Sequence, residues 1–176
     1  EVTLPTRTAL RSRSDGNGAG DPVEEPMAMS LQEALRAALD DEYHARATYR
    51  AVLDAFGEVH PFINIVESEE RHIQALKRQC EKHGMEVPSD KWAGGVSAPE
   101  SLERACEDAV KAERKNAALY EKLIEAATEY PDVQETFRRL QAASQERHLP
   151  AFERAAGREG RGDGRGRRRR HRGGSR

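Results

Sequence analysis

Hydrophobic positions recur every three or four residues through the middle of this chain, and no segment alternates with the two-residue period of a strand. The first periodic segment, residues 31 to 56, follows a capping-box pattern that begins at Ser30, and Gly57 ends it. The second segment, residues 62 to 80, ends before Gly84. Both segments have the length and period that predict an amphipathic helix.

Two further helices are predicted after a segment that contains several glycines and prolines. A second capping-box pattern, at Ser97, opens a segment that continues to about residue 130, where Pro131 interrupts it. The last periodic segment covers residues 132 to 156, and Pro150 should kink it because proline cannot donate the helical hydrogen bond. Four helices without a strand predict an all-α, antiparallel four-helix bundle.

Every predicted helix carries a polar residue with metal-binding chemistry on its apolar face. Counting residues from the turns places Glu42 level with Glu69, and Glu113 level with His148. His72 follows Glu69 by about one turn on nearly the same face. Buried carboxylates are costly unless they take up protons or hold a cation, so three of them at one depth predict a divalent metal. Oxygen ligands with two imidazoles suit iron or manganese better than zinc.

The composition defines the borders of the domain. Of the 176 residues, 36% are hydrophobic and 34% are charged, which suits one domain with tails. Residues 1–29 and 157–176 lack periodicity and are expected to be disordered, which leaves residues 30–156 as the bundle. The C-terminal tail has nine Arg and two acidic residues, a net charge of +7, and could bind nucleic acid or another polyanion. It has no aromatic side chain for base stacking, so a solvated tail is the simpler interpretation.

Several protein classes are excluded or left open by the same composition. Two cysteines are too few for a disulfide framework or for a structural zinc site. No apolar run approaches the roughly 20 residues that cross a bilayer, so no transmembrane segment is expected. The chain starts without a leader pattern, and its localisation, cytoplasmic or secreted, is left open.

Acidic residues and histidines recur at helical spacing in three stretches, DEY at 41–43, PFINIVESEERH at 61–72 and SQERHLP at 144–150. Together these stretches resemble an uncharacterised prokaryotic branch of the ferritin-like di-iron carboxylate superfamily. The resemblance extends over about residues 30–156. In that superfamily two helices each give one Glu, and the other two each give a Glu-x-x-His pair.

The resemblance implies a metal ligand set and a cofactor. Iron is implied, with manganese as an alternative, and so is a reaction with dioxygen or peroxide. The second Glu-x-x-His pair departs from the pattern, because Gln145 stands three residues before His148. This departure leaves three alternatives open: one ion instead of two, a bound hydroxide, or ligation by the Gln145 amide oxygen. The candidate ligands are Glu42, Glu69, His72, Glu113 and His148, with Gln145 as a further one.

The resemblance also implies a particular connection between the second and third helices. A ferritin-like bundle places these helices parallel, so the chain between them crosses the length of the bundle. Residues 85–96 reach at most about 40 Å, and the second helix is about 33 Å long, so the crossing is feasible. Cys80 and Cys106 would then lie toward opposite ends of the bundle, too far apart for a disulfide.

Three classes of function are compatible with this sequence. The first is an oxidoreductase with iron in the bundle core, and the second is a protein that holds metal without turnover, which the missing fourth carboxylate favours. The third is a helical interaction module whose buried acids are protonated, and a homo-oligomer is possible in each class. Tyr49 and Tyr120 are predicted core residues that could approach a metal, and Asn116 is predicted to orient a ligand from the turn after Glu113.

Overall fold

The computed structural model describes residues 29–162, with side chains as far as residue 158. This part of the chain is helical and contains no strand. The fourth helix of the bundle is continuous but has three parts, because a π-helical segment, η1, separates α4 from α5. The elements are α1 (Leu31–Phe56), α2 (Phe62–Lys82), α3 (Leu102–Ala126), α4 (Pro131–Ala143), η1 (Ser144–His148) and α5 (Leu149–Gly162).

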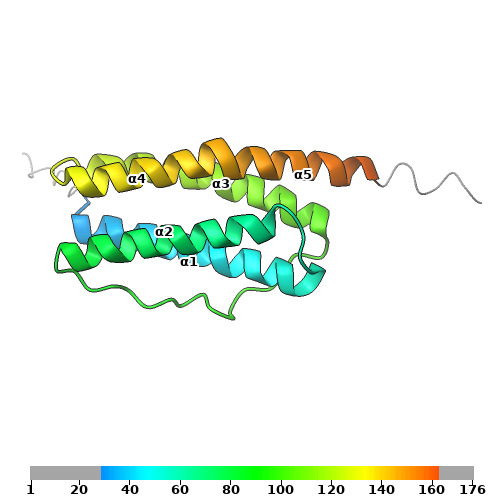
Figure 1. Ribbon diagram of the computed structural model, residues 1–176, viewed down its shortest axis with the longest axis horizontal. Coiled ribbons are helices and arrows are strands. Elements are labelled where there is room, and N and C mark those ends of the chain that lie inside the picture. The colour runs from blue at the N-terminus through cyan, green and yellow to red at the C-terminus, as the bar shows by residue number, and fades with distance from the viewer. Residues whose placement is uncertain (1–28, 163–176) are drawn as a thin grey trace, which may run out of the picture.

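The predicted long connection is confirmed. Figure 1 shows α1 and α2 as an antiparallel hairpin, after which residues 83–101 run along the whole bundle to the start of α3. As a result α3 runs parallel to α2, and α4 with α5 returns antiparallel to α3. Neither Cys80 nor Cys106 is in a disulfide, and they belong to separate hydrophobic clusters, as the connection requires.

The helix boundaries agree with the sequence in part. Ser30 and Glu33 form the predicted capping box at α1, and Gly57 at its end has a φ of 83°, which glycine adopts without strain. The predicted start of α3 at Ser97 is wrong, because the hydroxyl of Ser101 accepts the cap hydrogen bond from the Arg104 amide. Because α3 starts later than predicted, more residues are available for the segment that crosses the length of the bundle.

The ends of the last two helices also differ from the prediction. α3 ends at Ala126 rather than near residue 130, and the residues before Pro131 form a turn. α5 continues through Gly157 to Gly162, so this single glycine does not stop the helix. Residues 163–176, and with them most of the predicted basic tail and its polyanion binding, lie outside the described residues, as does nearly all of segment 1–29. No helix of the described region is long and apolar enough to span a membrane.

Two hydrophobic clusters occupy the two ends of the bundle and leave a polar layer between them. One cluster contains Leu35, Leu76 and Phe137, and the other contains Phe62 and Phe152. Most buried polar residues come from the stretch of each helix at or near the border between its contributions to the two clusters. The fold therefore holds these polar side chains between two apolar regions, where burial is costly unless the groups are paired. They are Glu42, Glu69, His72, Glu113, Ser144 and His148; a further buried polar residue, Thr136, lies beside Phe137 of the first cluster.

Candidate metal centre

The five residues predicted as metal ligands, other than Gln145, converge in the polar layer and are called the candidate centre below. Among the described residues, two groups of three each place their potential ligand atoms within 4.8 Å of one another. Glu69 belongs to both groups, and all five residues are 8% exposed or less. Such buried groups could hold a metal ion. The groups are Glu42, Glu69 and His72, and Glu69, Glu113 and His148.

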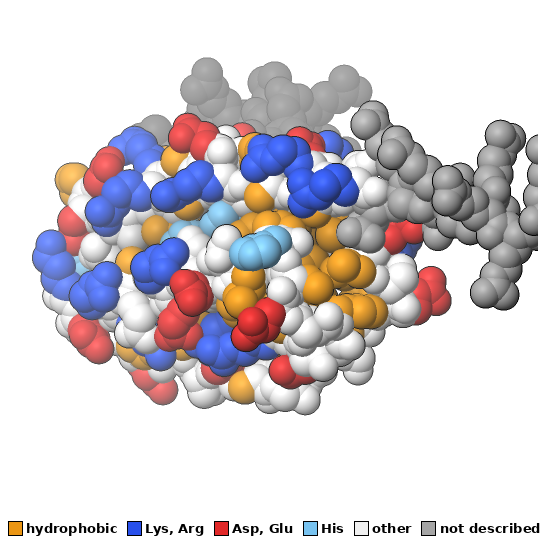
Figure 2. Space-filling view, turned by 45° about the vertical axis from the view of Figure 1, so that its right-hand side comes forward, with side chains coloured by type: hydrophobic (Ala, Val, Ile, Leu, Met, Phe, Trp, Pro, Cys, Tyr) orange, Lys and Arg blue, Asp and Glu red, His pale blue; other side chains and the backbone are white. Residues whose placement is uncertain are grey.

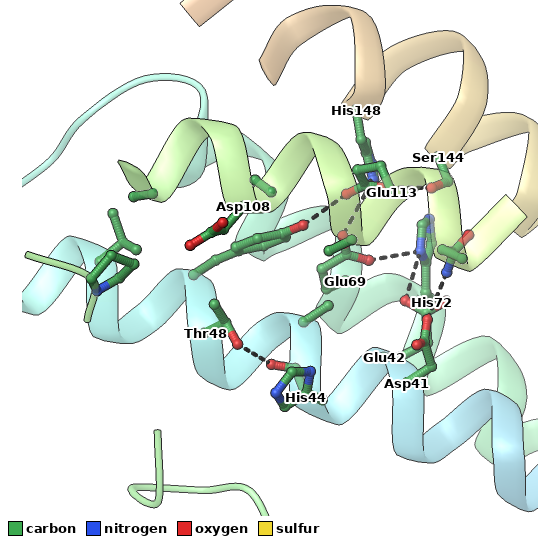
Figure 3. A pocket seen from close by; sticks show the side chains of 18 residues that line it. Asp41, Glu42, His44, Thr48, Glu69, His72, Asp108, Glu113, Ser144 and His148 are labelled. Atoms are coloured by element: carbon green, nitrogen blue, oxygen red, sulfur yellow. Dashed lines mark hydrogen bonds and ion pairs between the residues drawn. The ribbon is translucent and has the colours of Figure 1, made fainter. Parts of the chain in front are cut away.

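Glu69 lies between the two histidines, as Figure 3 shows. Its Oε2 is 3.0 Å from Nδ1 of His72, and its Oε1 is 3.2 Å from Nδ1 of His148. A second, outer carboxylate faces the same nitrogen of each histidine: Glu42 Oε2 is 3.2 Å from His72 Nδ1, and Glu113 Oε1 is 3.6 Å from His148 Nδ1. The two groups are thus alike in composition and share one carboxylate.

Two tyrosines support the outer carboxylates crosswise. The Tyr120 hydroxyl, from α3, donates to Oε1 of Glu42 on α1 at 2.5 Å. The Tyr49 hydroxyl, from α1, donates to Oε1 of Glu113 on α3 at 2.8 Å. Both tyrosines are fully buried, so these hydrogen bonds fix the carboxylates without water. In the sequence each Glu precedes a Tyr by seven residues, a signal that could have indicated this arrangement.

Two serines complete the contacts of the candidate centre. Ser68 Oγ lies 3.3 Å from Nε2 of His72 and 3.1 Å from Nε2 of His148, on the side of the rings away from Glu69. The imidazole rings are stacked, with centroids 5.5 Å apart. Ser144 donates a hydrogen bond to Oε2 of Glu113. Neither serine is among the predicted ligands, although the pattern Ser-x-Glu-Arg-His occurs twice, at 68–72 and at 144–148.

The π-helical segment carries the two residues of the fourth helix that face the candidate centre. Ser144 and His148 are buried, whereas the three residues between them are exposed. Gln145 is among the exposed ones and belongs to neither group, so the structure does not bring this candidate to the centre. Pro150 explains the widened turn, because in a regular α-helix its ring would clash with the carbonyl four residues earlier. The predicted kink is therefore a π-helical turn just before the proline.

Protons compensate for the buried charges in this arrangement. Burial lowers the pKa of His72, but its hydrogen bonds to Glu42 and Glu69 outweigh this and raise the pKa to about 10. The pKa of His148 is raised to about 9 in the same way, by Glu113 and Glu69. Burial, together with the negative charge of Glu69, raises the pKa of Glu42 to about 8. Although Glu69 is buried too, its hydrogen bonds to both histidines hold its pKa well below the ordinary value.

Asn116 has a different partner from the predicted one. Its amide nitrogen donates to Asp41 Oδ2 at 2.7 Å, so it orients Asp41 and not Glu113. Burial raises the pKa of Asp41, with a lowering contribution from Asn116 and raising contributions from the charges of Glu113 and Glu69. Asp41 and Asn116 line a cavity of about 170 Å³ that extends from the candidate centre between α1 and α3.

Comparison with known proteins places the chain in a family. An uncharacterized protein domain, DUF2202, matches residues 32–163, which include all four helices of the bundle and the whole candidate centre. The chain belongs to the DUF2202 family. The structure of this chain is similar to the crystal structure of hypothetical protein MJ0754 from Methanococcus jannaschii DSM 2661. The TM-score is 0.67 at 24% identity, over 80% of this chain and 87% of that one, and this similarity supports the fold alone. No curated protein matches.

Proposed function

We propose that this DUF2202 protein is a ferritin-like di-iron carboxylate protein that holds two divalent ions, iron by preference, at the candidate centre. The observation that carries the proposal is the shared position of Glu69, whose two oxygens face two separate histidines, each with its own outer carboxylate. A carboxylate shared by two similar ligand groups could serve two ions held side by side.

The chemistry of the donor atoms fits this pair. Each group offers two carboxylates and one imidazole nitrogen, counting Glu69 in both, and neither group contains a cysteine. Such oxygen-rich sites with imidazole suit iron or manganese, whereas thiolates would favour zinc or an iron–sulfur cluster. The raised pKa values of His72 and His148 support the proposal, because bound cations would replace these protons in neutralising the carboxylates.

The residues of this chain would bind, orient and shield the ions. A pair of ferrous ions, when bound, supplies two electrons, the number needed to reduce one peroxide to water. Tyr49 and Tyr120 hold the outer carboxylates, and Ser68 fixes the orientation of both imidazoles through Nε2. The hydrophobic clusters on either side limit the access of bulk water.

Metal binding without turnover is a second candidate, and one observation favours it. The fourth helix contributes a serine, Ser144, and no carboxylate to the candidate centre. Three carboxylates leave two divalent ions with a net charge of +1, which favours the ferrous over the ferric state. Repeated additions of ferrous ions distinguish the two candidates, because oxygen consumption continues with each addition only if the centre turns over.

Metal analysis of the purified protein tests the proposal directly. We expect two metal ions per chain, mainly iron, by inductively coupled plasma mass spectrometry. Replacing Glu69 with Ala should remove both ions, since this residue serves both groups. The matched control is Glu121→Ala, which removes an exposed carboxylate from α3. A wild-type protein that binds no divalent metal after addition of ferrous or manganous ions would contradict the proposal.

A further inference from the structure

The cavity beside the candidate centre is enclosed by small and apolar side chains. It lies between α1 and α3, has a volume of about 170 Å³, and reaches the candidate centre at its inner end. Figure 3 shows Thr48 and Asp108 on the two flanking helices, with Glu69 and His72 deeper inside. The space exists because alanines occupy both walls. They are Ala45 on α1 and Ala105, Ala109 and Ala112 on α3.

Nearly all polar groups that line the outer cavity have partners elsewhere. The Thr48 hydroxyl donates to the His44 carbonyl at 2.9 Å. Asp108 pairs with Arg104 and Lys111 at 3.0 and 3.1 Å. A molecule inside this part of the cavity therefore meets mainly methyl groups and aromatic carbon.

The polar groups at the inner end are engaged in the same way, with one exception. The Tyr49 hydroxyl is engaged by Glu113, so the tyrosine offers its ring to the cavity. The amide oxygen of Asn116 is buried and has no hydrogen-bond partner in the described part of the chain, while its nitrogen donates to Asp41. An unpartnered buried acceptor is costly, so this oxygen favours a ligand that donates a hydrogen bond. The cavity thus combines apolar walls with one unpartnered acceptor, in addition to carboxylates that already have partners.

The mouth of the cavity opens to the surface of the bundle. His44 and Ala112, one on each helix, line it and are exposed, whereas Ala109 is buried. A dry cavity of about 150 Å³ is large enough for benzene, so this one has room for a single small ring.

We propose that this cavity binds a small, mainly apolar organic molecule with one hydroxyl or amine donor, and that this molecule is the substrate of the candidate centre. The role as substrate rests on the proposed function, whereas binding in the cavity does not. The ligand enters between His44 and Ala112, packs against the alanines and donates to Asn116 Oδ1, which brings it next to the outer carboxylates.

Fluorine NMR with fluorobenzene and 4-fluorophenol tests the proposal on the purified protein. We expect both probes to bind the wild type, with 4-fluorophenol several-fold tighter because only it can donate to Asn116. The variants Ala45→Leu and Ala112→Leu, one on each wall, should each weaken binding at least tenfold. Ala118→Leu, which adds the same side chain at an exposed position of α3 outside the cavity, should leave binding unchanged.

The outcomes separate this inference from the proposed function. Failure of both probes to bind, or equal effects of Ala112→Leu and Ala118→Leu, would overturn the cavity as a binding site even if two metal ions are present. Equal affinity of the two probes, or a preference that persists in Asn116→Leu, would overturn the role of the Asn116 amide. If the protein binds the probes but takes up no added divalent metal, the cavity stands as a binding site. The substrate role is then refuted together with the metal centre.

Discussion

Metal binding at the candidate centre should release about three protons at pH 7. Metal ligation needs neutral imidazoles and ionised carboxylates, whereas His72, His148 and Glu42 have pKa values raised to about 10, 9 and 8. Each of these groups is therefore at least about nine-tenths protonated at pH 7 before the metal enters. Glu69 contributes no proton, because its pKa is lowered.

The same values fix how the release changes with pH. At pH 9, Glu42 has lost its proton, His148 is half protonated and His72 is still mainly protonated, so the release falls to about one and a half protons. Because protons compete with the metal, affinity should rise close to a thousandfold per pH unit near pH 7, about tenfold for each proton released. Raising the pH further should increase affinity less and less steeply.

Calorimetric titration with manganous ions measures this release without oxidation of the metal. Titrations at pH 7 in buffers of different ionisation enthalpy give the number of protons from the slope of heat against that enthalpy, and a second series at pH 9 gives the change. His60→Ala, at an exposed histidine outside the candidate centre, is the control and should leave the number unchanged. Release of fewer than one proton at pH 7, or the same number at both pH values, would refute the protonation scheme.

Stability, metal affinity and thiol chemistry offer further tests. Chelation should lower the melting temperature of the metal-loaded protein. The decrease should be smaller at pH 6 than at pH 8, because protons weaken metal binding at the lower pH. An unchanged melting curve after verified metal removal would argue against metal as a stabilising ligand. Tyr120→Phe should weaken manganese affinity about 10- to 100-fold in the same calorimetry, and Tyr130→Phe should not. Phe152→Ala, at a fully buried ring, should lower the free energy of unfolding by about 3–5 kcal/mol in urea. Mild oxidation should not join Cys80 to Cys106 within the monomer, which mass spectrometry without reductant can check.

The depth of the polar residues was predictable because it depends only on helical rise. Counting from Gly57 and Pro131 placed Glu42 level with Glu69 and Glu113 level with His148, and the structure brings these side chains together. The length of the crossing segment likewise allowed the parallel placement of α2 and α3.

The finer contacts of the candidate centre were not predictable from period and length. The regular walk that places His148 on the apolar face gives no sign of the π-helical turn before Pro150, in which Ser144 and His148 are buried and Gln145 is exposed. The crosswise pairing of Tyr49 and Tyr120 depends on how far α1 and α3 are rotated about their axes, and this rotation is set by packing rather than by periodicity.

The shared position of Glu69 makes the two helical hairpins unequal partners in assembly. The first hairpin, α1 with α2, carries one complete group, Glu42, Glu69 and His72, and can present it before the second hairpin docks. The second hairpin supplies only Glu113 and His148, so its group exists only after docking places Glu69 beside them. If the two proposed ions bind, they would therefore be taken up in a fixed order as the chain folds, and loss of the second ion would be the earliest sign that the hairpins have separated.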